Sequence, residues 1–368
     1  MRLERFDMAD DLGTPPKPQV KAAAAPWLKN AWYVAAWDFE VTNDQPLARR
    51  ILGEDVVLYR GADGAVTAMV DRCPHRLAPL SAGRIEGGNL RCMYHGLLFD
   101  PQGRCVDVPR QETIGPNLRV RTFPVLERDR YVRIWMGDPA LADPGRAADC
   151  HWQVDPAWRS LPGYMHYPQA DYRLITDNLL DFSHLGFVHE TTLGGGRSSA
   201  EVEPVIERFD WGARITRWYR NDPLPPYLRK VAKFDGPVDR WQIFEWRIEG
   251  LLLSMDSGSA PAGTGAPESH VVPEACVFHS CQSLTPETAR STHYFWTYAH
   301  NFDLDNAEVT QELFRQVHAG FEEDKAIIQA QQRVIDDHPE EKMVGIAADA
   351  ALQHVRSRLG RMLAAEGG

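Results

Sequence analysis

The first third of the chain alternates short apolar runs with turn residues. Residues 56–59 and 131–135 are two such runs, rich in Val, Tyr, Ile and Trp and separated from the next run by Gly, Asp or Pro. Such runs between turn residues are typical of strands. The pattern therefore predicts a small all-β domain over residues 27–143. Residues 1–26 show no sustained period and contain several prolines and a run of alanines, which predicts a flexible N-terminal arm.

The rest of the chain, residues 144–368, predicts a second domain, and an Ala-, Asp- and Pro-rich segment at 139–149 predicts the linker before it. One large antiparallel sheet is predicted by long aromatic strand patterns at residues 211–219, 240–253, 276–284 and 291–302. Flanking helices are expected at 177–188 and, from apolar residues at helical spacing, at 307–335. The expected fold class is therefore α+β. Residues 257–268 are rich in Gly, Ser, Ala and Pro, which predicts a flexible surface loop.

Composition and charge narrow the class of protein. The 368 residues are 43% hydrophobic and 25% charged, which is ordinary for a globular chain of two domains. The net charge of −11 argues against nucleic acid as a partner, and no apolar stretch reaches the ~20 residues of a membrane helix. We therefore expect a soluble, cytoplasmic protein. Six cysteines are too few for a disulfide scaffold, and buried free thiols are expected at Cys105, Cys150, Cys276 and Cys281.

Two short motifs pair a cysteine with a histidine. Cys73 and His75 stand in one motif, and Cys92 and His95 in the other. Two thiolates suit one iron of a [2Fe-2S] cluster, and two imidazoles on the other iron raise its reduction potential. Gly96, directly after the second motif, lets the backbone approach the cluster closely. The alternative is a structural zinc site, but such sites pair like ligands within each short loop, so the spacing favours the cluster.

A second constellation contains two histidines five residues apart, His184 and His189. Five residues on a regular α-helix turn through ~500°, which leaves the two side chains ~140° apart. A metal shared by both rings therefore requires the helix to end or distort, and Gly186 lies between them where it can permit that break. Without a shared metal, the two rings could instead be core histidines.

A third ligand for this site is expected from the late helix. Two histidines and one carboxylate, with open positions, are the usual way to hold non-haem iron(II) for oxygen chemistry. Positions counted along 307–335 place Asp324 on the apolar, inward face, where a carboxylate is costly unless it is paired or binds metal. The neighbouring Glu322 and Glu323 are expected to point into solvent.

These motifs together resemble the Rieske non-haem iron aromatic ring-hydroxylating oxygenases, as the oxygenase component. The pattern is most similar to the vanillate and dicamba O-demethylase monooxygenases. The resemblance covers nearly the whole chain after the arm. It rests on Cys-Pro-His-Arg, Cys-Met-Tyr-His-Gly, Asp-Asn-Leu-Leu-Asp-x-Ser-His-x4-His at 177–189, Asp-Arg-Trp-Gln at 239–242, Glu-Asp at 323–324 and His-Pro-Glu at 338–340.

The resemblance implies a homotrimer in which the cluster of one subunit faces the mononuclear iron of its neighbour. Asp181 matches the bridging carboxylate, which would accept hydrogen bonds from a cluster histidine across the interface and from His184. Asn178 matches a polar residue near the iron, although a capping or core role remains open. Dioxygen is the implied co-substrate and a small aromatic compound the implied substrate.

The chain carries no Gly-x-Gly-x-x-Gly after a strand and no plant-type ferredoxin motif, so a separate ferredoxin-type reductase must supply electrons from NAD(P)H. Residues 71–133 hold eleven Arg, no Lys and seven Asp or Glu, a balance of +4 inside an acidic chain. We hypothesise that this segment docks the acidic reductase by electrostatic steering, while subunit contacts are an equal alternative use of these arginines.

The function expected is that of a terminal oxygenase that removes an O-methyl group, or dealkylates nitrogen, with release of formaldehyde. Ring hydroxylation or dihydroxylation is one alternative, and a Rieske electron carrier without oxygenase activity is another. For the substrate pocket, Trp296 and His293 on the aromatic strands are candidates. Arginines that could hold a carboxylate are Arg217, Arg240 and Arg247. Candidate lids are residues 194–199 and 257–268.

Overall fold

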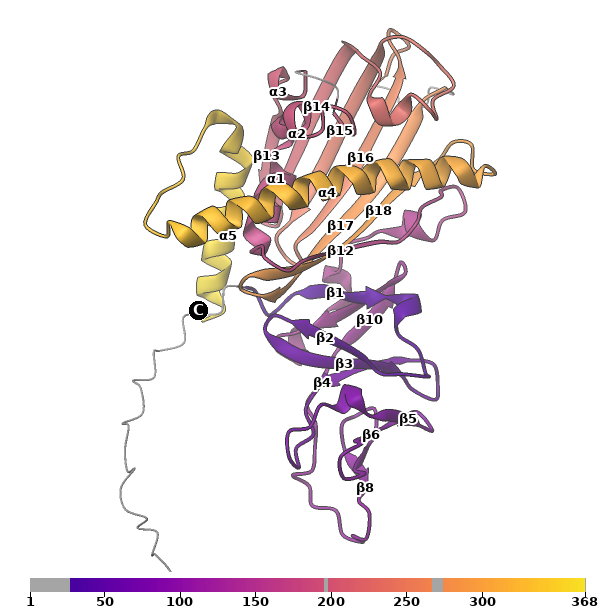
Figure 1. The fold of residues 1–368 in the computed structure, drawn as a ribbon, viewed down its shortest axis with the longest axis vertical. Helices are drawn as coiled ribbons and strands as arrows, with labels where there is room; N and C mark the ends of the chain where they lie inside the picture. The colour runs from indigo at the N-terminus through magenta and orange to yellow at the C-terminus, as the bar shows by residue number, and fades with distance from the viewer. Residues whose placement is uncertain (1–26, 195–197, 267–273, 368) are drawn as a thin grey trace, which may run out of the picture.

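The computed structural model describes residues 27–194, 198–266 and 274–367. The predicted arm at 1–26 lies outside this range, as do residues 195–197 and 267–268 of the two candidate lids. The described chain forms two parts, an all-β part drawn at the bottom of Figure 1 and a larger part in which helices cover a wide sheet. The predicted α+β class is confirmed. Within the described ranges, no helix combines the length and apolar character needed to cross a membrane.

Three small sheets build the N-terminal domain. The first is made of β1 (Trp32–Trp37), β11 (Tyr131–Trp135) and β10 (Val125–Arg128). The second is made of β2 (Leu47–Ile51), β3 (Glu54–Arg60), β4 (Val66–Val70) and β9 (Thr122–Phe123). The third, at the far end of the domain in Figure 1, is made of β5 (Arg84–Glu86), β6 (Asn89–Arg91), β7 (Leu98–Phe99) and β8 (Cys105–Asp107).

A seven-stranded antiparallel sheet forms the centre of the C-terminal domain. In spatial order its strands are β12 (Gly163–Tyr167), β18 (Ser291–His300), β17 (Cys276–Thr288), β16 (Leu252–Pro261), β15 (Val238–Arg247), β14 (Gly212–Asp222) and β13 (Val205–Phe209). The predicted single strand at 240–253 is wrong, because the chain turns back at 248–251, where Gly250 and Leu251 have φ of 78° and 47°. The predicted loop at 257–268 is also wrong at its start, since residues 257–261 pair with β15 as part of β16.

Helices cover one face of this sheet (Figure 1). They are α1 (Tyr172–Leu180), α2 (Leu185–Val188), α3 (Ser198–Glu201), α4 (Ala307–Asp337) and α5 (Ala350–Ala365). Short 3-10 turns are η1 (Asp38–Glu40), η2 (Leu80–Ala82), η3 (Pro139–Leu141), η4 (Pro144–Arg146), η5 (His151–Gln153), η6 (Phe182–His184), η7 (Pro226–Leu228) and η8 (Ala347–Asp349). The predicted helix at 307–335 is confirmed as α4, whose apolar side packs on the sheet.

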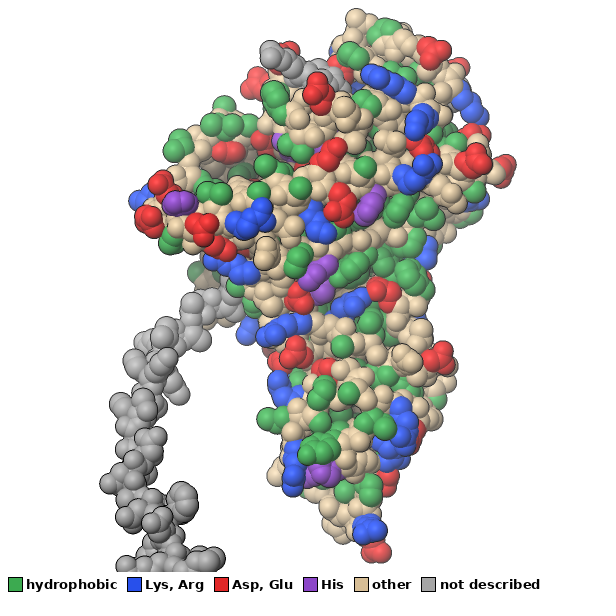
Figure 2. Space-filling model, viewed as in Figure 1, with side chains coloured by type: hydrophobic (Ala, Val, Ile, Leu, Met, Phe, Trp, Pro, Cys, Tyr) green, Lys and Arg blue, Asp and Glu red, His purple; other side chains and the backbone are tan. Residues whose placement is uncertain are grey.

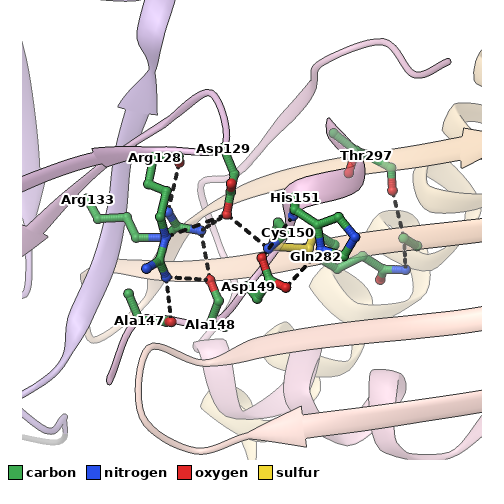
Figure 3. The surroundings of a disulfide bond; sticks show 12 residues. Arg128, Asp129, Arg133, Ala147, Ala148, Asp149, Cys150, His151, Gln282 and Thr297 are labelled. Atoms are coloured by element: carbon green, nitrogen blue, oxygen red, sulfur yellow. Dashed lines mark hydrogen bonds and ion pairs between the residues drawn. A yellow bond between two sulfur atoms is a disulfide. The ribbon is translucent and has the colours of Figure 1, made fainter. Parts of the chain in front are cut away.

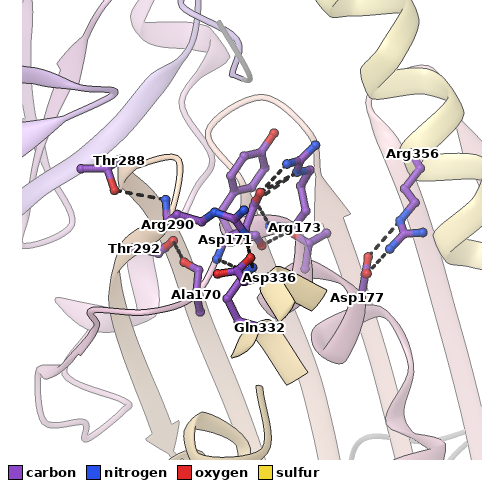
Figure 4. A network of polar contacts seen from close by, with 12 residues as sticks. Ala170, Asp171, Arg173, Asp177, Thr288, Arg290, Thr292, Gln332, Asp336 and Arg356 are labelled. Carbon is purple, nitrogen blue, oxygen red and sulfur yellow. Dashed lines mark hydrogen bonds and ion pairs between the residues drawn. The ribbon is translucent and has the colours of Figure 1, made fainter. Parts of the chain in front are cut away.

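Polar contacts fix α1 between α4 and α5 (Figure 4). The Asp171 side chain caps α1 by accepting from the Arg173 backbone, and the Asp171 backbone N–H donates to Gln332 of α4 at 2.9 Å. Farther along α1, Asp177 forms an ion pair with Arg356 of α5. Because α1 leads directly into the segment that carries the two candidate histidines, these contacts place that segment over the sheet.

A disulfide bond joins the segment between the domains to the large sheet (Figure 3). Cys150, directly before η5, bonds to Cys281 of β17, with Cα atoms 6.5 Å apart, and both side chains are fully buried. The backbone N–H of Cys150 donates to Asp129, which fixes the segment against the N-terminal domain. The prediction of free thiols is therefore wrong for this pair, because the fold brings together cysteines 131 residues apart. Cys105 and Cys276 are buried free thiols, as predicted.

Candidate metal centres

The two cysteine–histidine loops, Cys73-Pro-His75 and Cys92-Met-Tyr-His95, repeat the same backbone geometry. In the first loop the Cys73 N–H donates to the carbonyl of Ala78 at 2.8 Å, and in the second the Cys92 N–H donates to Leu97 at 2.8 Å. Four residues after each cysteine, an N–H donates back to the cysteine carbonyl, at 2.9 Å and 3.0 Å. That fourth residue has positive φ in both loops, 58° in the first and 77° at Gly96. The loops therefore present their side chains as a matched pair.

The matched loops bring all four sequence-predicted cluster residues together. Both cysteines are 1% exposed, and burial together with the neighbouring Cys92 thiol raises the pKa of Cys73 to about 11. The rings of His75 and His95 lie at the surface with centroids 4.4 Å apart. Two buried thiols beside two solvent-facing imidazoles fit a mixed-ligand [2Fe-2S] cluster, since positive iron would stabilise both thiolates.

Arginine and carboxylate side chains are intermingled over the surface of the N-terminal domain (Figure 2). Eight of the eleven arginines in residues 71–133 lie within ion-pair distance of a carboxylate. Within the described ranges, Arg76, Arg110 and Arg119 have no carboxylate partner. The positive charge that is free of an ion pair in this segment is therefore smaller than the count of eleven arginines indicates. A docking surface for a reductase stays a prediction.

The second candidate centre forms where α1 ends. Asp181 leaves the helix with φ −128° and caps the 3-10 turn η6 by accepting from the Ser183 backbone at 2.8 Å. This turn and the short α2 follow each other without a long regular helix, so His184 and His189 come to face one another, with ring centroids 5.3 Å apart. The expected break between the two rings is present, but it lies at the end of α2, where His189 leaves the helix with φ −110° and ψ 35°, rather than at Gly186, which sits inside α2.

The two rings converge on the carboxylate predicted from the late helix. His189 Nε2 lies 3.1 Å and His184 Nε2 3.4 Å from Asp324 Oδ1. One ligand atom from each residue lies within 4.8 Å of the other two. Burial alone would raise the pKa of Asp324, but the two histidines lower it to about 2. Asn178 Nδ2 donates to the same Oδ1 at 2.9 Å, so this amide lies beside the three residues.

Hydrogen bonds at the far side of each ring leave the inner nitrogen free for a metal. His184 Nδ1 lies 2.6 Å from the backbone carbonyl of Asp181, and His189 Nδ1 lies 2.7 Å from Glu323 Oε2. Each Nδ1 must therefore carry the proton, because its neighbour can only accept. The fully buried Nε2 of His189 has no hydrogen-bond partner among the described residues. This arrangement, with a carboxylate oriented towards both rings, fits an iron(II) site.

Glu323 is a functional residue that the sequence did not reveal. Its Oε2 accepts from His189 and, at 2.7 Å, from the hydroxyl of Thr192, whereas the helical count had placed it in solvent. Glu322 is exposed, as predicted, and lies near Lys325 on its own helix. The single available signal was the adjacency of Glu323 to a candidate ligand, which does not identify its partner.

The carboxylate of Asp181 has different partners from those expected. Its oxygens accept from the backbone and hydroxyl of Ser183, each at 2.8 Å, and Oδ1 lies 3.5 Å from Nη2 of the buried Arg217. His184 contacts the backbone carbonyl of Asp181 rather than this carboxylate. The expected bond from His184 to the carboxylate is therefore wrong, and the expected contact across a subunit interface stays a prediction.

A cavity opens beside the three candidate iron ligands, between the helices and the sheet. Its walls include Leu179, Phe182, Met255, Val317 and Phe321, and its polar lining includes Asn178, Arg240, Gln242, Ser257 and Gln282. The apolar walls can hold an aromatic ring next to the metal site and keep bulk water away from it. The polar residues are supplied mainly by strands β15 to β17.

Two candidate pocket residues lie elsewhere. Trp296 does not line the cavity; its ring packs between the sheet and α4, with centroids 4.7 Å from Phe314 and 5.0 Å from Phe321. His293 points to the other face, where it bonds the Tyr164 hydroxyl at 2.8 Å, and burial lowers its pKa to about 4. The expectation that both residues bind substrate is therefore wrong, because His293 lies on the face away from the helices and α4 fills the space beside Trp296.

Comparisons with known proteins agree with this geometry. Residues 31–124 match the Rieske [2Fe-2S] domain, and residues 168–365 match the vanillate O-demethylase oxygenase C-terminal domain. The toluene-4-sulfonate monooxygenase system iron-sulfur subunit of Comamonas testosteroni is 50% identical, over 93% of this chain and 99% of its own length. The dicamba O-demethylase oxygenase component of Stenotrophomonas maltophilia is 38% identical, over 83% of this chain and 88% of its own.

Solved structures of dicamba monooxygenase have the same fold as this chain. The crystal structure of dicamba monooxygenase bound to dicamba superposes with a TM-score of 0.83 and 34% identity, over 92% of this chain and 98% of the other. A further structure of dicamba monooxygenase, with non-haem iron and dicamba, superposes with a TM-score of 0.78.

Proposed function

This chain belongs to the Rieske non-haem iron oxygenases, as the oxygenase component of a monooxygenase system, and we propose that it oxidises a methyl carbon of a small aromatic compound. The first candidate is an O-methyl group, whose oxidation gives a hemiacetal that releases formaldehyde and a phenol. One atom of dioxygen enters the methyl carbon, and the other leaves as water with two electrons and two protons. The observation that carries the proposal is the convergence of His184, His189 and Asp324 beside a cavity with apolar walls.

In this proposal the family's two cofactors would bind at the two candidate metal centres described above. The thiolates of Cys73 and Cys92 hold one iron of the [2Fe-2S] cluster, and His75 and His95 hold the other. The mononuclear iron is held by His184, His189 and Asp324. When bound, the two centres supply single-electron transfer and activation of dioxygen.

The protein side chains perform the positioning. Glu323 and the Asp181 carbonyl hold both ring protons on Nδ1, so that the Nε2 atoms of His184 and His189 stay available. Asn178 donates to Asp324 and fixes the orientation of its carboxylate. The apolar cavity walls hold the substrate ring and exclude water during the reaction.

Electron supply requires partners. We propose a ferredoxin-type reductase that takes electrons from NAD(P)H, and a homotrimer in which Asp181 links the cluster of one subunit to the iron of the next. Large apolar side chains are exposed on the cluster loops, which supports a contact there: Leu77, Met93 and Tyr94. A cytoplasmic location is supported by the need for a nicotinamide electron donor.

A second candidate reaction is oxidation of a methyl group attached directly to the ring. It is favoured by the 50% identical relative, which is named for toluene-4-sulfonate, a methylarene. Ring hydroxylation remains a further alternative at the same site. An electron carrier without oxygenase activity is disfavoured, because a carrier has no need of the second centre.

The test supplies the oxygenase with a reductase, NADH and ¹⁸O₂, and offers 4-methoxybenzoate and toluene-4-sulfonate separately. We expect formaldehyde in proportion to NADH from the first compound, or a benzylic alcohol carrying one ¹⁸O from the second. His184→Ala should keep the colour of the cluster but lose mononuclear iron and both products. Ring-hydroxylated products with the methyl group intact would overturn the proposal.

A further inference from the structure

A buried arginine lies in the cavity at some distance from the candidate iron ligands. Arg240 is 3% exposed and sits on β15, on the face of the sheet that meets the helices. Its guanidinium lies over the ring of Tyr219, on the neighbouring strand, at 5.1 Å from the centroid. Burying a charged side chain is costly unless the charge is paired and its donors are hydrogen-bonded, so the partners of this guanidinium matter.

Internal contacts use only part of this guanidinium. Among the described residues its single hydrogen-bond partner is Asp222, which Nη1 reaches at 3.3 Å. Nε and Nη1 of Arg217 are fully buried without a hydrogen-bond partner in the described part of the chain. The remaining nitrogens of Arg240, Nε and Nη2, are not among such fully buried atoms. Arg240 lines the cavity and Arg217 does not. Donors of Arg240 are therefore available to a molecule in the cavity.

A second donor points the same way from the same strand. Gln242 lies two residues along β15, on the same face, and also lines the cavity. The hydroxyl of Tyr219 donates to its Oε1 at 3.0 Å, which turns the Nε2 amino group away from Tyr219. An arginine fork beside an amide N–H₂ is a donor set suited to an oxyanion with two or three equivalent oxygens.

Arg240 and the candidate iron ligands lie apart along the cavity. The ring of Phe182, in the same turn as His184, stacks on Phe244 of β15 with centroids 4.4 Å apart, so Phe244 marks the metal end of the cavity. Arg240 lies four residues away on the same strand, about 13 Å at ~3.3 Å per residue. The Arg240 side chain leans the other way, towards Asp222, which lies opposite Val238, so the anion site and the metal site lie at different ends of the cavity.

We propose that Arg240, with Gln242, binds a sulfonate or carboxylate substituent and thereby selects aromatic anions as substrates. The anion is held at one end of the ring, and the methyl carbon at the other end is presented to the iron site. This inference rests on the proposed function, because it concerns the same cavity. It assigns Arg240 as a specificity-determining residue that contacts substrate.

Binding affinities of matched anionic and neutral ligands test the proposal. Calorimetry with the intact, cluster-containing protein would compare toluene-4-sulfonate with toluene-4-sulfonamide, and 4-methoxybenzoate with 4-methoxybenzamide. A charge-assisted hydrogen bond in a buried site predicts that each anion binds about 10- to 100-fold more tightly than its neutral partner. Arg240→Gln should remove this preference, and Arg240→Lys should retain part of it. Equal binding of anion and amide by the unaltered protein would overturn the proposal.

A control and a second variant separate this effect from a loss of folding. Arg247→Gln removes another arginine of β15, one that pairs with Glu245 and has a half-exposed side chain, and should leave the preference unchanged. Because Arg240→Gln leaves Asp222 unpaired, Asp222→Asn combined with Arg240→Gln removes both charges and should show the same loss of preference. A drop for anion and amide alike would indicate general damage and refute the assignment. The products from ¹⁸O₂ test the reaction itself, so failure of either idea can be recognised without the other.

Discussion

Glu323 provides the sharpest test of the candidate iron site. Its carboxylate fixes the proton of His189 on Nδ1 and is itself held by Thr192. Removing such a partner typically weakens metal binding about 10- to 100-fold, or about 1.4 to 2.8 kcal/mol. Glu323→Gln keeps an acceptor and loses the charge, so the lower end of this range is expected. Glu323→Ala loses both and should approach the upper end.

The assay is an anaerobic titration of iron(II) into protein whose mononuclear site has been emptied, with a competing chelator. The visible absorbance of the cluster reports in the same sample that the N-terminal domain is intact. The matched control is Glu322→Ala, one position away, because Glu322 is exposed and its ion-pair partners among the described residues, His318 and Lys325, lie on its own helix. If Glu323→Ala and Glu322→Ala bind iron with equal affinity, the role assigned to Glu323 is refuted.

Three further predictions concern other parts of the molecule. Arg217→Gln should retain both metals yet slow single-turnover electron transfer from cluster to iron, because the Asp181 carboxylate loses its cationic partner; an unchanged rate would contradict this role. Gly96→Ala should shorten the lifetime of the cluster absorbance, since a Cβ at φ 77° would lie 2.9 Å from a proline side chain and cost about 1 to 2 kcal/mol or more; equal lifetimes would exclude this strain. Burial raises the pKa of Asp177 to about 6 despite its ion pair with Arg356, so the folded state holds this proton more tightly than the unfolded chain. That contribution is present below pH 4 and is lost, by about 3 kcal/mol, as the pH rises through 6. Denaturant titrations should therefore show Asp177→Asn gaining stability relative to the unaltered protein over this range, and a constant difference would disprove the assignment.

The residues of the two candidate metal centres could be predicted because their signals are local. Cys73 and His75 are recognisable by their residue types and spacing. Asp324 is recognisable by its place on the inward face of a long helix. The same helical count wrongly placed Glu323 in solvent, because it could not anticipate a contact with His189, which lies 134 residues away in the chain. Periodicity describes how a side chain points from its own helix, but not what the fold places beside it.

Errors in the fold have a related physical origin. The β15–β16 hairpin was predicted as one strand because apolar residues continue through its turn, and Gly250 is a weak signal among them. Trp296 was expected in the cavity, yet its ring fills the space between β18 and α4. Strand patterns do not show which aromatic residue fills the core and which lines a cavity, since Trp241 and Tyr298 of the same sheet do line it.

The two candidate metal centres differ in when a growing chain can complete them. The cluster residues all lie between 73 and 95, whereas the iron site joins residues 184 and 189 to Asp324, which is 135 residues later than His189. At about 5 to 20 residues per second, synthesis takes about 7 to 27 s to cover that distance. During this interval the two histidines exist without their carboxylate. The first centre can therefore be filled on a nascent chain, while the second is complete only once synthesis has passed Asp324.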